Sequence, residues 1–377
     1  MTDLTSSIGA ALPDYEVQRE LGRGAMGVVY LGRHRRLDRD VAIKEIAGPL
    51  ADDPEVRSRF LTEARILAKL DHPHIVPVYD YVEEAGRYLL IMEALGGGTV
   101  WDRFRRDGLT LPAACAITLA TCAAVDHAHR KGVLHRDIKP ENLLFSATGE
   151  LKVTDFGIAK VVDGGRTMAT IDGSVLGTPA YMAPEQAEGA DVGPAADVYA
   201  IGTMLYEFLS GRLPFEGDSP MAMLVSRITA DAPPLTSAAP GVPLAVAHVV
   251  DRALARPLPD RYPSAEAFAR ELHTAVTTTL GAGWLDQAGM TVVGLGLAAP
   301  TVAPAGAGPA ASPAGSGAAP PTVVPSAAPP APGTIAPGAD RSAPDTVGPS
   351  VDHPAPGTVA PGTDRPAPGT VAPSGRR

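Results

Sequence analysis

Cysteine is scarce in this chain, which has two cysteines in 377 residues. Cys115 and Cys122 lie seven residues apart in an apolar helical pattern and so fall on one helix face. We interpret them as buried small side chains, with a redox or metal role as the less favoured alternative. The spacing does not imply a framework of disulfides, and this suits a reducing cytoplasm, where we expect the protein.

An excess of basic residues and long apolar runs are also lacking. The formal net charge is -10, which argues against general nucleic-acid binding because that normally needs a basic surface. Residues 290–299 form an apolar stretch about half as long as a membrane-spanning helix. Residues 1–12 have neither the basic start nor the apolar core of a signal peptide. We therefore expect no transmembrane segment.

Aromatic residues are absent from residues 300–377, although 19 of the 38 prolines fall there. The charges of this segment cancel, with four Asp and four Arg, so the net charge belongs to the residues before it. A segment of this composition cannot bury enough apolar surface to offset the entropy lost on ordering. We predict a folded region of roughly residues 12–275, followed by a disordered tail.

The tail contains an internal repeat, Pro-x-Thr-[Val/Ile]-x-Pro, whose five copies begin twelve residues apart. A unit of twelve residues without a core-forming face is too short for a solenoid. We predict an extended, polyproline-like array. The repeat places five threonines in equivalent settings: Thr322, Thr334, Thr346, Thr358 and Thr370.

The folded region changes character along its length. Strand-like segments dominate its first part, with one helix expected near residues 54–70. Gly96, Gly97 and Gly98 then interrupt the pattern. Later segments are mostly helical. This order predicts an α+β protein with a small β-rich lobe, a larger helical lobe and a cleft between them. The expected strands are 15–17, 28–31, 41–44, 76–82 and 88–93, and the later helices are 112–131, 197–209, 243–254 and 264–274.

A glycine-rich segment, Gly22-x-Gly24-x-x-Gly27, also matches the dinucleotide-binding fingerprint. That fingerprint requires a helix directly after its last glycine, whereas a β-branched and aromatic strand, residues 28–31, follows here. We therefore predict a hairpin whose backbone approaches phosphates closely, with a purely structural turn as the alternative.

Lys44 ends the strand-like segment 41–44, where its ammonium could neutralise phosphate charge. It needs an acidic partner to fix its direction, and Glu63 in the middle of the predicted helix is the favoured candidate. Glu55 is the alternative, but an acidic residue at a helix start can simply complement the helix dipole.

The segment His135-Arg136-Asp137-Ile138-Lys139-Pro140-Glu141-Asn142, with Asp155-Phe156-Gly157 after it, carries the strongest chemical signal. Asp137 could accept the proton of an incoming hydroxyl. Asn142 and Asp155 could hold the metal ions that bridge nucleotide phosphates. The spacing predicts phosphoryl transfer from Mg·ATP.

Taken in order, these motifs and Ala183-Pro184-Glu185 resemble the eukaryotic-like Ser/Thr protein kinase family of bacteria. The resemblance covers about residues 15–273. It implies a bilobal protein kinase fold, with an N-lobe of about 15–95 and a C-lobe of about 96–273. Residues 1–14 would be an N-terminal extension, 274–299 a linker and 300–377 the tail.

The resemblance also assigns roles. Asp137 would be the catalytic base and Lys139 would steady the transferred phosphoryl group, with Mg²⁺ or Mn²⁺ as cofactor. Lys139 is typical of kinases that act on Ser or Thr, and Thr178 resembles the threonine that contacts the catalytic loop in them. Met92 would close the back of the adenine pocket. ATP would be bound by Leu21, Gly22, Gly24, Gly27, Val29, Ala42, Lys44, Glu93 and Leu95.

Other matched residues are interpreted as structural. Glu185 would pair with Arg261, and Asp197 would anchor the backbone of the catalytic loop. An apolar stack that aligns the lobes would consist of Leu67, His135 and Phe156. For His127 and His129 we expect packing or capping rather than metal binding, because the sequence places no partner ligands nearby.

Regulation is expected in the segment between Asp155 and Glu185. We predict autophosphorylation at Thr170, with Thr167 as second choice, because an arginine such as Arg136 often pairs with a phosphate on this loop. A transient homodimer would permit the reaction in trans.

The tail threonines allow two interpretations. Once phosphorylated, they could recruit phosphothreonine-reading partners such as FHA modules, whose binding would gain from the equal spacing. The favoured alternative is a neutral tandem duplication in a low-complexity tether.

Three rival classes of function fit the sequence less well. A pseudokinase would lack Lys44, Asp137 or Asp155, and all three are present. A small-molecule phosphotransferase of the aminoglycoside type usually lacks Ala-Pro-Glu and a threonine-bearing activation segment. A P-loop ATPase needs Gly-x4-Gly-Lys-[Ser/Thr], which is absent. A mainly scaffolding protein with modest kinase activity remains open, as do the protein substrates and the activating signal.

Overall fold

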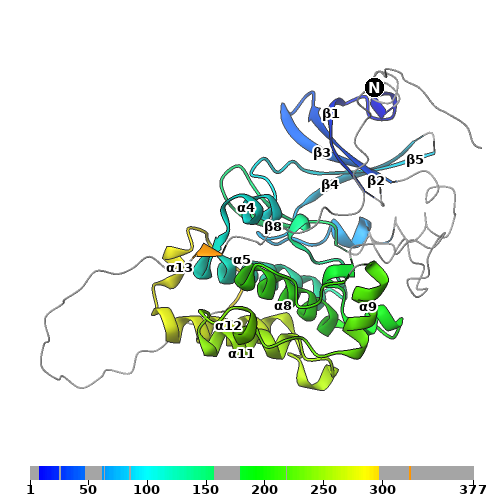
Figure 1. Cartoon of the computed structure of the whole chain (residues 1–377). Helices are drawn as coiled ribbons and strands as arrows, with labels where there is room; N and C mark the ends of the chain where they lie inside the picture. Colours follow the sequence, from blue (N-terminus) through cyan, green and yellow to red (C-terminus); the bar gives the residue numbers. More distant parts are fainter. Residues whose placement is uncertain are drawn as a thin grey trace, which may run out of the picture. The chain divides into compact units, whose positions relative to one another are not determined.

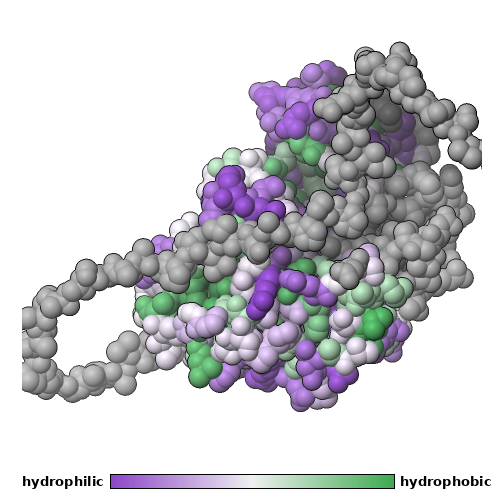
Figure 2. Space-filling view, in the orientation of Figure 1, coloured by the Kyte–Doolittle hydropathy of each residue, from purple (hydrophilic) through white to green (hydrophobic). Residues whose placement is uncertain are grey.

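A β-rich region precedes a mainly helical one, which confirms the predicted α+β, bilobal arrangement (Figure 1). Hydrophilic side chains gather over the β-rich part in the view of Figure 2, where most of the first strand is exposed. The computed structural model describes residues 8–24, 27–46, 62, 64–84, 86–156, 179–217, 219–296 and the backbone of 322–323.

The β-rich lobe is one antiparallel sheet with strand order β1-β2-β3-β5-β4. All five predicted strand segments lie in it, although β4 begins two residues later than expected. The delay has a physical cause, because the N–H of Val76 donates instead to Val153 O, 3.0 Å away in the other lobe. The strands are β1 (Tyr15–Gly24), β2 (Gly27–His34), β3 (Arg39–Ile46), β4 (Val78–Glu84) and β5 (Arg87–Glu93).

Alternation along the strands gives this sheet two apolar faces. One face contributes Ala42, Leu90 and Met92 to a cluster that includes Val76, in the loop before β4. The opposite face packs against residues 8–12, where Ile8 is fully buried and Leu12 nearly so. Residues 8–12, expected to be part of an extension, therefore belong to the core of the lobe.

The helical lobe is built around α5 and α8, whose residues are buried over most of their length. A short hairpin of β7 (Leu143–Phe145) and β8 (Leu151–Val153) lies against it. The helices are α4 (Val100–Asp107), α5 (Leu111–Arg130), α7 (Pro184–Glu188), α8 (Pro194–Ser210), α9 (Pro220–Thr229), α10 (Leu235–Ala238), α11 (Leu244–Ala253), α12 (Ala265–Leu280) and α13 (Trp284–Gln287). Short 3-10 turns occur at η1 (Pro140–Asn142), η2 (Pro179–Tyr181) and η3 (Leu258–Asp260).

Helix α5 is the one helix in the described part of the chain that is long and apolar enough to cross a membrane. Most of its apolar window is buried inside the fold, as in the core helix of many globular proteins. Cys115 and Cys122 are among these buried residues, as predicted, and burial raises the pKa of the Cys115 thiol to about 12. Burial raises the pKa of Cys122 as well, so both thiols are poor nucleophiles.

The segment expected to be a linker, 274–299, is folded in its first part. Helix α12 continues to Leu280, and the indole of Trp284 is fully buried in the main core. Residues 290–295 also pack there, through Met290, Val292 and Leu295. The domain boundary at residue 273 stays a prediction, but the described core extends past it.

Two predicted segments lie mostly or partly outside the described residues. Of the expected helix 54–70, residues 62 and 64–67 are helical and residues 54–61 and 63 are not described. Of the tail, β9 (Thr322–Val323) is described. It pairs antiparallel with β6 (Leu109–Thr110), the short strand between α4 and α5.

Candidate active site

Strand register brings the predicted phosphate-binding residues into one row. Gly22 on β1 lies opposite Val29 on β2, and Val29 lies opposite Lys44 on β3. Gly27 begins β2 with a φ of 141°, and a Cβ there would lie 1.8 Å from Glu45 O, so a side chain cannot be accommodated. The predicted hairpin is confirmed, with β1 and β2 joined near Gly24.

The flanking ATP-site candidates surround this row. Ala42 is buried on β3 opposite Leu31 and Met92, and Glu93 ends β5 opposite Val41. Leu95 packs beside the cluster of Ala42 and Met92. Leu21 differs from these residues because 44 % of it is exposed at the β1 edge.

Lys44 crosses from the sheet to the helical lobe. Its Nζ lies 2.7 Å from Oδ1 of Asp155, just after β8, and the lysine is only 6 % exposed. Burial alone would raise the pKa of Asp155, but the Lys44 charge and hydrogen bond outweigh burial and lower it. The carboxylate is therefore ionised at neutral pH and is held directly by a cation.

The loop before β7 gathers the other candidates around Asp137. Lys139 Nζ donates to Asp137 Oδ2 at 2.8 Å. The Asn142 side-chain amide donates to the Asp137 carbonyl oxygen at 2.8 Å and to its carboxylate at 3.2 Å. These donors fix the Asp137 carboxylate. About one fifth of the Asp137 side chain remains exposed, so an incoming hydroxyl can reach the carboxylate.

Asp197, at the start of α8, holds the backbone of this loop. Its carboxylate accepts hydrogen bonds from the backbone N–H groups of His135 and Arg136, both at 2.8 Å. His129 Nε2 lies 2.7 Å from the same carboxylate, which is the polar contact that explains His129. Arg136 has a φ of 67°, an uncommon conformation for a side-chain-bearing residue that these bonds help to hold.

A second set of bonds ties the loop to Asp155. Thr154 N–H donates to Asn142 O at 2.9 Å, and His135 Nε2 lies 2.9 Å from Thr154 O. The His135 ring lies against Phe156, with centroids 4.6 Å apart, and Leu67 belongs to the same apolar cluster as Phe156. The predicted contact between His135 and Phe156 is therefore present, and Leu67 lines the same small cavity as Phe156. Asp155 itself has a φ of 64°, a second uncommon conformation at this site.

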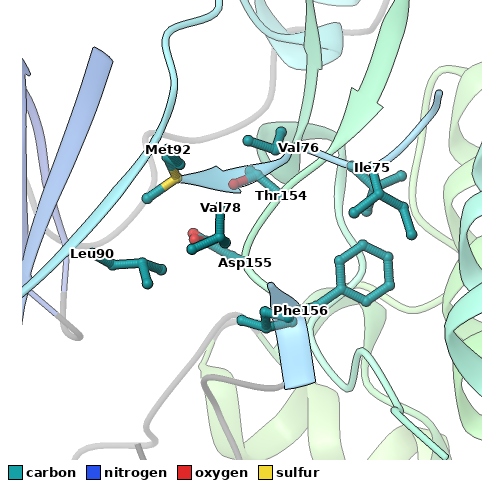
Figure 3. Close-up of a pocket in the computed structure, with 10 residues that line it drawn as sticks. Ile75, Val76, Val78, Leu90, Met92, Thr154, Asp155 and Phe156 are labelled. Atoms are coloured by element: carbon teal, nitrogen blue, oxygen red, sulfur yellow. The ribbon is translucent and has the colours of Figure 1, made fainter. Parts of the chain in front are cut away.

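A small cavity of about 20 Å³ lies beside Asp155. In Figure 3, Leu90 and Met92 from β5 lie on one side and Ile75 and Phe156 on the other. Met92 thus lines this cavity, and its place at the back of an adenine pocket stays a prediction. The lining is apolar apart from Asp155 and Thr154.

The pair predicted between Glu185 and Arg261 is present and fully buried. Two guanidinium nitrogens donate to the two carboxylate oxygens at 2.8 and 3.0 Å, a bidentate geometry. The pair joins α7 to the turn after η3. It therefore fixes the segment that follows the predicted phosphorylation loop.

Two further polar contacts around the same segment were not predicted from the sequence. Gln186 Nε2 donates to the carbonyl oxygen of Arg136 at 3.0 Å, and so links α7 to the Asp137 loop. Arg227 on α9 is fully buried and donates to the carbonyl oxygens of Met182, at 2.7 Å, and Ala180. A lone arginine in a helix of mixed polarity gives no sequence signal for such a role.

Several candidates lie outside the described residues: Glu55, Glu63, Thr167, Thr170 and Thr178. Arg136, the predicted phosphate partner, is described. Its Nε is buried and has no hydrogen-bond partner among the residues that the structure describes.

A divalent cation fits the donors that are present. Among the described residues, no three His, Cys, Asp or Glu side chains come together as a metal site. Asn142 and Asp155, however, offer two oxygen donors from adjoining segments. This pattern suits Mg²⁺, which commonly takes one or two protein ligands and completes its shell with phosphates and water.

Comparison with known proteins gives one family. The model of the protein kinase domain matches residues 15–247. The chain is 38 % identical over 262 residues to the serine/threonine-protein kinase PrkC of Bacillus subtilis, covering 69 % of this chain and 40 % of PrkC. It is 39 % identical over 263 residues to the serine/threonine-protein kinase PknB of Mycobacterium tuberculosis, covering 68 % of this chain and 42 % of PknB.

Solved structures of kinase domains also match this chain. The crystal structure of the Mycobacterium tuberculosis PknI kinase domain is similar, with a TM-score of 0.56 and 31 % identity. That match covers 70 % of this chain and 96 % of the PknI chain. The present chain thus spans about two fifths of the length of the curated relatives named above, and nearly all of a solved kinase domain.

Proposed function

This chain belongs to the protein kinase family, among the eukaryotic-like Ser/Thr kinases of bacteria, and we propose that it transfers the terminal phosphoryl group of ATP to Ser and Thr hydroxyls of proteins. The observation that carries the proposal is the linked pair of contacts Lys44–Asp155 and Lys139–Asp137. One pair joins the two lobes and the other lies on the loop beside it. Together they provide the charges that phosphoryl transfer needs.

Asp137 has the position of the base. Its carboxylate accepts the proton of the incoming hydroxyl, while Lys139 neutralises charge on the phosphoryl group in transfer. Lys44 lies in the row of Gly22 and Val29, so its ammonium can meet the phosphates beneath the β1–β2 hairpin. The protein takes little part in covalent chemistry. It positions the reacting groups and stabilises their charge.

Asn142 and Asp155 would hold Mg²⁺ or Mn²⁺. The metal would neutralise phosphate charge and orient the nucleotide. The chain prepares for it by keeping Asp155 ionised, since the Lys44 ammonium lowers the pKa of this carboxyl. The backbone hydrogen bond from Thr154 N–H to Asn142 O keeps Asn142 and Asp155, the two candidate metal ligands, on neighbouring segments.

The test is phosphorylation by purified full-length chain with radiolabelled ATP and a general protein substrate. We expect Asp137→Asn to lower kcat by about a thousandfold or more with unchanged folding, because the base is lost. Glu188→Gln, an exposed carboxylate on α7, is the matched control and should keep full activity. Equal rates for wild type and Asp137→Asn would overturn the proposal. If the rates differ as expected, phosphoproteomics of cells that express wild type or Asp137→Asn would identify the substrates.

Lys44→Met separates enzyme from scaffold. If the cellular phenotype persists in this variant although phosphorylation is lost, a mainly scaffolding role is correct. Loss of both supports signalling through catalysis. A small-molecule phosphotransferase is less favoured because the segment Ala183-Pro184-Glu185 is present and Glu185 is paired with Arg261.

We extend the proposal to regulation of the loop. The buried Nε of Arg136, unpartnered among the described residues, supports a phosphate on the loop as its partner, and Thr170 is the favoured site with Thr167 second. Thr170→Ala should lower activity, whereas full activity with no phosphate mapped on the loop would refute this. A transient homodimer would carry out the reaction.

The remaining expectations also stay proposals. These are a cytoplasmic location, and tail threonines that recruit phosphothreonine-reading, FHA-type proteins. Incubation of active protein with ATP followed by phosphate mapping tests the second, since an unmodified tail removes the ligand that such partners read.

A further inference from the structure

A two-residue strand of the tail pairs with the helical lobe. Val323 lies opposite Leu109 and Thr322 lies opposite Thr110, in an antiparallel register. Figure 1 shows β9 as the orange arrow, far in sequence from β6, and the same segment also lies close to α8. Thr322 and Val323 are the central dipeptide of the first copy of the tail repeat.

The β6 strand can accept no more than a short partner. Gly108 before it ends α4, with a φ of 68° and its N–H bonded to Phe104 O. Thr110 is the N-cap of α5, and Pro112 occupies the first turn of that helix. Leu109 is buried, so the backbone of β6 gains from having a hydrogen-bond partner in place of water.

The repeat has a matching length. In each copy, Thr and Val or Ile form a β-favouring dipeptide with a proline two residues before the Thr and another two after the Val or Ile. Proline has no N–H and ends a ladder, so a copy offers only a short strand. The same dipeptide recurs at 334–335, 346–347, 358–359 and 370–371.

We propose that the β6 edge is a docking site for the tail repeats of the same molecule. It holds one copy at a time, with the first copy as the preferred occupant and the others as replacements. Recognition is by strand addition, in which backbone bonds give affinity. Attachment to the same chain supplies a high effective concentration, which lets a two-residue contact persist. The repeat is thus a set of internal ligands rather than a passive tether.

Cross-linking in the full chain tests the register. Thr110→Cys with Thr322→Cys places two thiols on opposite residues, within disulfide reach across an antiparallel pair. Thr110→Cys with Ser326→Cys is the matched control, four residues further along the same tether. We expect the first pair to oxidise at least about tenfold faster, which corresponds to about 1.4 kcal/mol of preference. The native cysteines are buried and do not compete.

Equal rates for the two pairs would overturn the proposal, because tethered collision alone would then explain the bond. Disulfide-linked dimers in place of monomers on a non-reducing gel would overturn docking within one molecule. The experiment should give the same result with Asp137→Asn added. The docking site therefore stands or fails separately from the proposed kinase activity.

Replacement is tested with the second copy. Val323→Pro removes an N–H from the first copy. In a chain with Thr110→Cys and Thr334→Cys, this change should raise the cross-linking rate several-fold, because the second copy then occupies β6. An unchanged rate would show that the copies are not interchangeable.

Discussion

Glu207 is a buried carboxyl on α8 whose protonation makes the stability of the helical lobe depend on pH. Tyr181 O–H donates to its Oε2 at 2.6 Å, and burial raises the pKa of Glu207 to about 7. The folded state therefore keeps this proton up to about pH 7, whereas the unfolded chain releases it near its ordinary value of 4.5. The stability contributed by protonated Glu207 is complete below pH 4.5 and is lost as the pH rises through 7.

We predict that Glu207→Gln reduces the loss of stability that accompanies a rise in pH. Between pH 5 and 8 the free energy of unfolding of the wild type should fall by up to about 3 kcal/mol through this group, and the fall should be smaller in the variant. Urea unfolding at several pH values measures it. Glu188→Gln, at an exposed position, is the control. Parallel pH profiles for wild type and Glu207→Gln would contradict the prediction.

At the scale of elements, strands were predicted well because their pattern is local. The alternation in β2, β3 and β5 reflects a sheet with two apolar faces. The end of α12 was missed because Thr277, Thr278 and Thr279 are poor helix formers by propensity. In the structure, Thr278 and Thr279 donate to carbonyl oxygens one turn back, and Thr277 accepts from the buried indole of Trp284. Tertiary packing overrides the propensity here.

In the candidate site, too, local features were predicted and long-range contacts were not. Residues in short motifs, such as Asp137 and Asn142, were identified because motif spacing reflects loop geometry. Gln186 and Arg227 were not, because their contacts join segments about 50 residues apart in sequence, and no local pattern records them. Asp155 was expected as a metal ligand, but its bond to Lys44 follows from the approach of two lobes.

Arg227 gives a prediction at this scale, since it fastens α9 to η2. Arg227→Ala should cost about 3 kcal/mol or more, because two carbonyl oxygens lose their donor and a buried volume is emptied. Activity should fall as well, because η2 precedes the Glu185 segment. Thermal unfolding and kinase assays measure both effects. Glu188→Ala, at an exposed position, should change neither. An Arg227→Ala protein as stable as wild type would refute the argument.

At the scale of the whole molecule, residues 281–296 act as a strap from α12 to the loop before β4. Trp284 is buried at one end. At the other, Val293 N–H donates to His74 Nε2 at 3.0 Å, and His74 Nδ1 lies 2.8 Å from Leu151 O. A Cβ on Gly294 would lie 2.2 Å from His72 Nε2, so the strap fits closely.

The strap leads to a prediction about the smallest stable kinase domain. A chain ending at residue 273, the boundary expected from family resemblance, should be less stable than one ending at residue 296. Loss of Trp284 alone should cost about 3–5 kcal/mol, which corresponds to a fall in Tm of roughly 10 °C for a domain of this size. The chain ending at 296 should unfold within a few degrees of the full chain. Calorimetry of the three chains measures this, and Trp284→Ala in the full chain checks the cause without truncation. Equal Tm values for the two shortened chains would place the strap outside the cooperative core.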